Sequence, residues 1–328
     1  MVGHDGVLAL PWLRPALASA LQSVRGHAIL VHGSPGDGAW DFGLALGQGW
    51  LCEHAEPGRR PCGQCPSCEL FRGWSHPDQS WLVPQELALA REMPVQVDSK
   101  RKPSRQIRVD DVREAIDSLT RTSGRGRGQV LVAFPAEAMN AVAASALLKT
   151  LEEPPAGTRI VLCAADPARL LPTILSRCQR LELPRPTQAE ALEWLDRQGI
   201  EGADTLLRAS SGRPLDAARL SAQGLSAVAW KALPRRVAAG DSAALTGLGI
   251  PGALDALGKV CHDAMAVAVG GEARFFDTGD LPRRPHLGRL ATWLRSLQQV
   301  QQHAEHPWNE PVLVDALLAE GREALSGG

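Results

Sequence analysis

The sequence predicts an α/β protein, with a parallel sheet in its first part and helices alone in its second. Short apolar runs alternate with amphipathic stretches up to about residue 185, an alternation typical of a parallel sheet. A glycine-rich turn follows the first apolar run, and four closely spaced cysteines follow the first amphipathic stretch. Beyond residue 185 the segments are rich in Leu, Ala and Arg with helical spacing, and no strong strand pattern remains.

The first element is an apolar run, 27–32, bounded by Gly26 and Gly33, and its β-branched content predicts a buried strand. The turn Gly-Ser-Pro-Gly-Asp-Gly follows and leads into an amphipathic stretch over 39–51, which predicts a helix. This strand, glycine-rich loop and helix have the frame of a phosphate-binding loop.

Two further strands are predicted over 130–134 and 159–164, with a helix between them over 141–153. Asn140 is the expected N-cap of that helix, and the two prolines after Glu153 stop it. The polar segment 84–106 has its basic residues clustered at one end and is expected to be a long surface loop.

Composition shifts divide the chain. A boundary is expected near residue 185, in Pro-Arg-Pro, and a second near 224, inside helical sequence. The predicted domains are therefore 1–185, with a cysteine module at about 50–80, then 186–224 and 225–328.

The phosphate loop lacks its charged and hydroxyl groups. A working loop reads G-x-x-x-x-G-K-[ST], in which Lys neutralises the phosphates and the hydroxyl holds magnesium. Gly33 and Gly38 occupy the glycine positions, but Ala39 and Trp40 follow. The pattern predicts a tight turn that binds no ATP; the alternative is a nucleotide held weakly by backbone amides alone.

The second strand lacks catalytic acids as well. A Walker B strand ends in acids that hold Mg²⁺ and polarise water. Here the run ends in Phe134-Pro135-Ala136-Glu137, so Glu137, displaced from the strand end, is the only acid nearby. It is expected to face solvent. Two independent catalytic elements are therefore absent.

Cys52, Cys62, Cys65 and Cys68 form the pattern C-x9-C-x2-C-x2-C. Four thiolates suit Zn²⁺ in a closed, structural, tetrahedral site with no open position for catalysis. Redox-active thiols or an iron–sulfur cluster are the alternatives.

Other candidate ligands are expected to play no part in this metal site. Two nearby histidines are predicted to lie on the surface, and three cysteines remote from the cluster are predicted to be free thiols. These residues are His54, His76, Cys163, Cys178 and Cys261.

The net charge of −1 gives no argument for nucleic acid or membrane as a partner of the whole chain. No apolar run approaches the ~20 residues of a membrane span, and no signal peptide is recognisable, so the expected location is the cytoplasm. Arg125 and Arg127 lie between glycines and Arg121 lies shortly before them; contact of these arginines with DNA phosphate is one interpretation and a solvated loop the other.

The stretch 146–155, Ala-Leu-Leu-Lys-Thr-Leu-Glu-Glu-Pro-Pro, and the stretch 173–178, Thr-Ile-Leu-Ser-Arg-Cys, closely resemble the clamp-loader branch of AAA+ proteins. That branch includes the motor (gamma/tau) and delta-prime subunits of bacterial DNA polymerase III. The cysteine cluster is similar to both. The absent lysine and acids, together with segments 11–13 and 109–113, resemble the delta-prime subunits. The similarity covers roughly residues 8–220.

The resemblance implies an AAA+-like domain, a small helical lid domain and a helical collar domain for oligomerisation. It also implies that the four cysteines bind zinc and that Arg177 is an arginine finger, acting in the ATP site of a neighbouring motor subunit. Without the resemblance, Arg177 reads as a structural ion-pair residue.

The leading hypothesis is a non-hydrolysing subunit of a hetero-oligomer with motor subunits and a delta subunit, which helps to load the sliding clamp onto primed DNA. No membrane partner and no intrinsic ATPase are expected. An ATPase that binds nucleotide by an unusual route, and a zinc-stabilised scaffold with no clamp-loader role, are the alternatives.

Overall fold

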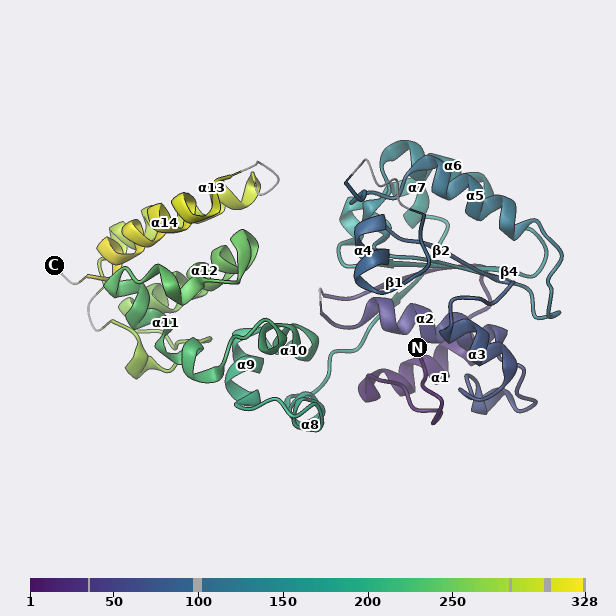
Figure 1. Cartoon of the computed structure of the whole chain (residues 1–328), viewed down its shortest axis with the longest axis horizontal. Helices are drawn as coiled ribbons and strands as arrows, with labels where there is room; N and C mark the ends of the chain where they lie inside the picture. The colour runs from purple at the N-terminus through teal and green to yellow at the C-terminus, as the bar shows by residue number, and fades with distance from the viewer. Residues whose placement is uncertain (35, 97–101, 283–284, 304–307, 327–328) are drawn as a thin grey trace. The chain divides into compact units, whose positions relative to one another are not determined.

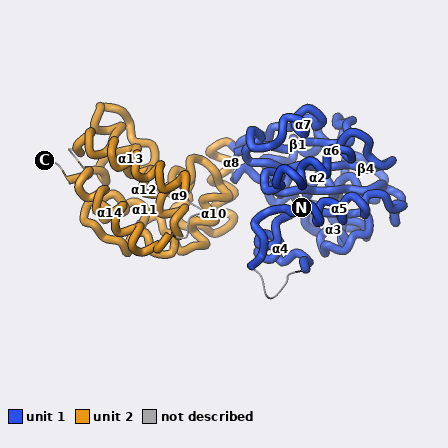
Figure 2. Tube along the Cα trace, turned by 90° about the horizontal axis from the view of Figure 1, so that it is seen from above, with its two compact units in different colours: residues 1–186 blue, residues 187–328 orange. Residues whose placement is uncertain are grey.

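The computed structural model describes residues 1–34, 36–96, 102–282, 285–303 and 308–326. The chain forms two compact units, Met1–Pro186 and Thr187–Gly328 (Figure 2). The further boundary expected near residue 224 stays a prediction, as do the lid and collar assignments.

The first unit is built on one five-stranded sheet with the order β2-β3-β4-β1-β5, and every neighbouring pair is parallel. The strands are β1 (Ala28–His32), β2 (Gln79–Leu82), β3 (Gln129–Ala133), β4 (Thr158–Ala164) and β5 (Gln179–Glu182). Because β1 lies between β4 and β5, the loop that leaves its carboxyl end has a neighbouring strand on either side.

Helices cover both faces of this sheet (Figure 1). One face carries α1 (Arg14–Ser23), α2 (Ala39–Leu51) and α3 (Pro66–Arg72), and the other carries α5 (Val109–Leu119), α6 (Ala141–Glu152) and α7 (Pro172–Leu175). The short α4 (Gln85–Ala90) follows β2, and 3-10 turns are η1 (Pro11–Leu13), η2 (Pro57–Arg59), η3 (Ala136–Ala138) and η4 (Pro167–Arg169).

The strands and helices that the sequence predicted in the first unit are present in the structure. Helix α2 has the predicted bounds, and β1, β3 and β4 lie where apolar runs predicted strands. Asn140 caps α6 as expected, since its side-chain oxygen accepts a hydrogen bond from the Ala143 amide at 2.9 Å. The predicted α/β fold class is confirmed.

Several elements of the first unit were not predicted: helices α1, α3, α4, α5 and α7, and strands β2 and β5. Strands β2 and β5 are four residues each and form the two edges of the sheet, where polar residues are tolerated and the apolar signal is weak. The predicted loop 84–106 was wrong at its start, which forms α4; residues 97–101 lie outside the described part.

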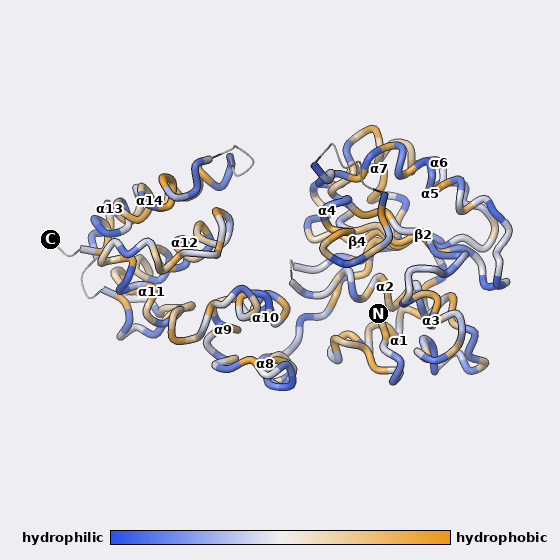
Figure 3. The backbone as a smooth tube through the Cα atoms, in the orientation of Figure 1, coloured by the Kyte–Doolittle hydropathy of each residue, from blue (hydrophilic) through white to orange (hydrophobic). Residues whose placement is uncertain are grey.

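Helix α2 packs closely on the sheet because it carries glycine at its contact points. A Cβ on Gly43 would lie 2.3 Å from the Cys163 sulfur, and one on Gly47 would lie 3.0 Å from a Val130 methyl group. Colouring by hydropathy shows that apolar residues are concentrated in the strands on which α2 packs (Figure 3). The close approach fixes both ends of α2, where the candidate sites lie.

The described residues of the second unit form helices joined by turns, with no strand among them. Its elements are α8 (Gln188–Arg197), α9 (Ala203–Ala209), α10 (Pro214–Ala222), α11 (Ala227–Ala239), η5 (Ser242–Leu245), α12 (Gly249–Ala268), η6 (Thr278–Asp280), α13 (Leu287–Gln302) and α14 (Glu310–Leu325). Two buried indoles anchor the core: Trp230 donates to the Phe275 carbonyl at 3.2 Å and Trp293 to the Leu317 carbonyl at 2.9 Å.

Among the described helices, none combines the length with the apolar character that a membrane crossing requires.

Candidate functional site

The glycine-rich loop joins β1 to α2, where a phosphate-loop protein holds its nucleotide. Gly38 has φ +92° and caps α2, and Gly36 has φ +85°, so both glycines adopt backbone conformations that other residues rarely reach. Pro35, between them and Gly33, lies outside the described residues. The backbone frame of an anion-binding loop is therefore present.

The loop carries an anion of its own. Asp37 is 2% exposed, and its Oδ2 accepts a hydrogen bond from the Ser34 amide at 2.7 Å. Arg185, which follows β5, lies with Nε 3.8 Å from the same oxygen and also donates to the Ser34 hydroxyl. A loop amide and a nearby guanidinium are thus engaged with the chain's own carboxylate, whose negative charge opposes a phosphate.

The magnesium positions are filled by aromatic rings. Trp40, where a hydroxyl would hold the ion, is 3% exposed and stacks on Phe134 with centroids 5.2 Å apart. Phe134 directly follows β3, the place of the first Walker B acid. Trp74 stacks on Trp40 at 6.3 Å and meets Trp81 edge-on at 5.5 Å. We call these four residues the aromatic cluster; it offers no magnesium ligand.

Glu137, expected to face solvent, holds a turn instead. Its Oε1 accepts hydrogen bonds from the amides of Ala165, at 2.9 Å, and Asp166, at 3.3 Å, and its Oε2 is buried. The expectation was wrong because the chain leaving β4 presents free amides beside η3. Glu137 therefore orders the carboxyl edge of the sheet.

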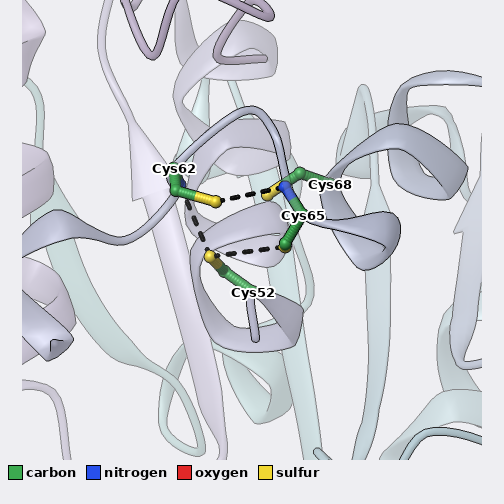
Figure 4. A group of neighbouring side chains, drawn as sticks. All are labelled: Cys52, Cys62, Cys65 and Cys68. Carbon is green, nitrogen blue, oxygen red and sulfur yellow. Dashed lines mark hydrogen bonds between the residues drawn. The ribbon is translucent and has the colours of Figure 1, made fainter. Parts of the chain in front are cut away.

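The four cysteines come together at the other end of α2 (Figure 4). Cys52 ends the helix, Cys62 follows η2, Cys65 caps α3 and Cys68 lies in its first turn. Their sulfur atoms all lie within 4.8 Å of one another, and those of Cys52 and Cys65 are 3.9 Å apart. Tetrahedral zinc with ~2.3 Å bonds needs sulfurs roughly 3.8 Å apart, so the cluster has the geometry to hold a metal.

Backbone amides favour thiolate at this cluster. The Cys52 sulfur accepts from the amides of His54 at 3.5 Å and Cys62 at 3.4 Å, and the Cys65 sulfur from the Glu53 amide at 3.4 Å. A hydrogen bond from Cys68, followed by these amides, lowers the pKa of Cys52 to about 4. The Cys52 thiolate in turn raises the pKa of Cys68. A cation would remove this repulsion and let all four thiols ionise.

A glycine holds the cysteine module against the N-terminal segment. Gly63 has φ +76°, and a Cβ there would lie 2.0 Å from the Gly3 carbonyl oxygen. Any side chain at this position would separate the two segments, so the turn between Cys62 and Cys65 requires glycine.

His76 is not on the surface, contrary to the sequence expectation. It is 3% exposed; its Nε2 lies 2.8 Å from the Ser67 hydroxyl and its Nδ1 accepts from the Asp78 amide at 3.0 Å. Burial lowers the pKa of its imidazole. His54 is half-buried and accepts the Glu56 amide at 3.2 Å, so neither ring is a fifth ligand.

The remaining cysteines are free, as expected, and all are buried. Burial raises the pKa of Cys178 to about 11 and of Cys261 to about 12, and it raises the pKa of Cys163 further. All three are therefore unreactive thiols.

Arg177 follows α7, with its side chain 32% exposed. It pairs with Glu152 at the end of α6 and donates to the Thr173 carbonyl at 2.8 Å. The two sequence motifs that resemble clamp-loader subunits, around 146–155 and 173–178, are therefore in direct contact.

Of Arg121, Arg125 and Arg127, it is Arg125 that forms an ion pair within the chain. Its Nε lies 2.6 Å from a Glu53 carboxylate oxygen, with both side chains about 30% exposed. This ion pair ties the loop to the cysteine module and was not anticipated. Arg121 and Arg127 are exposed.

The parallel sheet with a glycine-rich loop after β1, the four-cysteine insertion and the helical second unit define an AAA+-like protein of the clamp-loader kind. The family model described as "DNA polymerase III, delta subunit" matches residues 15–187, more than half of the chain. The chain belongs to this family, and its similar relatives include delta' and tau subunits of DNA polymerase III.

The delta' subunit of Pseudomonas aeruginosa is 39% identical over 225 residues, 66% of this chain and 62% of the relative. That of Escherichia coli is 36% identical over 211 residues, 62% of this chain and 58% of the relative. The chain thus spans about three fifths of the length of these two relatives. A gamma subunit-related protein of Thermotoga maritima matches at 17% identity with a TM-score of 0.47, over 95% of this chain and 99% of that one.

Proposed function

We propose that this chain is a non-hydrolysing subunit of a clamp-loader complex. It assembles with motor (gamma/tau) and delta subunits into a hetero-oligomer that loads the sliding clamp onto primed DNA. Membership of the delta' family supports this role. The phosphate loop, whose binding positions are occupied by the chain's own side chains, favours a subunit that does not hydrolyse ATP. Its contribution is a rigid wall and one side chain for a partner's active site.

The filled loop is the observation that carries the proposal. To admit a nucleotide, the loop would have to release the Asp37 carboxylate from the Ser34 amide and accept phosphate beside it. No ammonium offsets that repulsion, because Ala39 stands at the lysine position. Magnesium would find the stacked rings of Trp40 and Phe134 instead of oxygen ligands.

Arg177 is the side chain we assign to the partner's ATP site. A guanidinium supplied in trans stabilises the charge that develops on the γ-phosphate and needs no nucleotide on its own subunit. The ion pair with Glu152 is compatible with this role, since both side chains are partly exposed, 32% and 48%. Exposed pairs of this kind are worth only ~0–1 kcal/mol, so a polyphosphate can compete for the guanidinium.

Zinc is the metal we assign to the cysteine cluster, held by Cys52, Cys62, Cys65 and Cys68. The sulfur spacing fits tetrahedral coordination, and the amide-to-sulfur hydrogen bonds suit four thiolates. With all four positions filled by protein, the zinc supplies structure rather than catalysis. It would fasten the end of α2 to the start of α3.

The test is the DNA-stimulated ATPase of a complex reconstituted from motor subunits, a delta subunit and this chain. Arg177→Ala should lower turnover at the site it faces by about 10³-fold or more, the usual worth of an arginine finger. The total ATPase rate of the complex then falls by the fraction that this one site contributes. Arg177→Lys should not restore it, because the ammonium lacks the planar fork.

Arg169→Ala is the matched control, since Arg169 is an exposed arginine in the nearby η4 turn. It should leave the rate unchanged. If Arg177→Ala also leaves the rate unchanged while the complex assembles, the arginine-finger assignment is wrong. If the chain does not assemble with motor subunits at all, a zinc-stabilised scaffold outside the clamp loader becomes the better account.

A further inference from the structure

A cavity lined by arginines lies beside the cysteine module. It has a volume of about 310 Å³ and is lined by Trp50, Arg60, Arg127 and Arg159, among others. These four residues come from the last turn of α2, the segment after η2, the loop before β3 and the start of strand β4. The volume is at the low end of the ~300–1,000 Å³ typical of small-molecule sites.

The arginines of this cavity have no acidic partner. Within the described residues, no carboxylate forms an ion pair with Arg60, Arg127 or Arg159. Arg60 is positioned by backbone carbonyls instead: its guanidinium donates to His54 at 2.6 Å and to Ala55 at 3.2 Å. These bonds orient the group but leave its charge uncompensated. The concave surface therefore carries three positive charges.

Arg159 supplies an unused donor. Its Nη1 is buried without a hydrogen-bond partner, and its guanidinium lies 4.8 Å from the centroid of the Trp50 ring. A buried N–H group without an acceptor is costly, and native structures contain few. The indole fixes the guanidinium by a cation–π contact but accepts no strong hydrogen bond. The missing partner is an acceptor, and the surrounding charge calls for an anionic one.

The local field strengthens this reading. Burial lowers the pKa of Arg159 most, and the positive charge of nearby Arg25 lowers it further. The C-terminus of α2 opposes an anion with only about half a negative charge, against three guanidinium groups. The net charge around the cavity is therefore positive.

We propose that this cavity binds the phosphate group of a nucleotide or of a nucleic-acid strand, with Arg159 and Arg127 contacting its oxygens and Trp50 forming the wall. Guanidinium groups match phosphate geometry in a bidentate manner. The site is distinct from the phosphate loop. Trp50 is eleven residues along α2 from Ala39, about 16 Å at 1.5 Å per residue, and Arg159 lies at the amino end of β4, away from the carboxyl edge where the loop opens.

The test uses the isolated full chain and three probes: inorganic phosphate, thymidine monophosphate and a fluorescein-labelled oligothymidylate. Calorimetry follows the first two and fluorescence anisotropy the third. Arg159→Gln and Arg127→Gln should each weaken saturable binding about tenfold or more, as expected for loss of a charge-assisted contact. Arg127 is exposed, so its variant keeps the fold. Arg121→Gln, an exposed arginine outside the cavity lining, should bind as the wild type does.

Binding of oligothymidylate alone would support the proposal and assign the phosphate to a strand. Binding of thymidine monophosphate as well would support it and assign a nucleotide. No saturable binding of any probe would overturn the proposal, and so would equal weakening by all three variants. Neither result bears on Arg177, because no motor subunit is present.

Discussion

A potential binding site lies at each end of helix α2, and only one of the two keeps its ligand-binding groups. At the amino end, the phosphate loop keeps its glycines, but its ligand-holding positions are filled by Asp37, Trp40 and Phe134. At the carboxyl end, the cysteine cluster retains four sulfur donors at metal-binding distance. The same rigid helix, close-packed on the sheet through Gly43, supports both.

The positions that bind phosphate and magnesium in a working phosphate loop are not left as a cavity in this chain. The aromatic cluster occupies the magnesium positions with stacked rings, and the Asp37 carboxylate takes up a loop amide. The side chains at positions that bind magnesium in a working loop contribute packing here. At the cysteine end nothing replaces the donors, so stability there should still depend on a bound ion.

Metal removal should therefore have the largest effect. Purified chain should contain about one equivalent of zinc, and Cys52→Ser should retain less than half of that. Loss of zinc should cost about 5 kcal/mol or more in unfolding free energy, against the ~10–16 kcal/mol that zinc contributes in isolated peptides. Metal analysis combined with urea unfolding, before and after chelation, measures both quantities.

Cys178→Ser is the control, because Cys178 is a buried thiol outside the cluster. Its zinc content should equal that of the wild type. Stoichiometric iron, or no metal in protein purified without chelator, would contradict the zinc assignment.

Trp40→Ala should have the next largest effect. Removing a buried ring that stacks on Phe134 and Trp74 should cost roughly 3–5 kcal/mol. Trp308→Ala, at a ring 37% exposed, should cost less than about 1 kcal/mol. Denaturant unfolding compares the two. If Trp40→Ala were neutral, the aromatic cluster would not be the packing substitute described above.

The smallest effect concerns His76. Burial holds its folded-state pKa below the ordinary 6.5, so its contribution to stability is present above pH 6.5 and is lost as pH falls through the lowered value. Between pH 7.5 and 5.5, the wild type should lose more stability than His76→Gln does. His4→Gln, at an exposed histidine, should follow the wild type. Parallel pH curves for wild type and His76→Gln would contradict this account.

Much of this architecture follows from the sequence alone. Helix α2 and the cap at Asn140 were predicted correctly, because amphipathic spacing and capping chemistry are local properties. The edge strands β2 and β5 were missed, since they are short and owe their pairing to β3 and β1. The four-cysteine cluster was readable because its residues lie close together in the chain.

What remained hidden depends on contacts between distant segments. The stacking of Trp40 on Phe134 joins residues 94 positions apart, and Arg159 meets Trp50 across more than a hundred. Glu137 was mistaken for a surface acid because its partners are backbone amides, which leave no mark in the sequence. The motif shows that the lysine, the hydroxyl and the acids of a working phosphate loop are absent, but it does not show which contacts the side chains at those positions make instead.

The most direct test of the central claim is calorimetric titration of the isolated chain with ATP and Mg²⁺. At the phosphate loop we predict no saturable binding up to millimolar nucleotide and no phosphate release; any binding at the cavity lined by Arg159 is a separate event. Heats at the cavity lined by Arg159 are separated by repeating the titration with Arg159→Gln. Micromolar binding that survives in this variant, accompanied by turnover, would contradict the account and make the chain an ATPase in its own right.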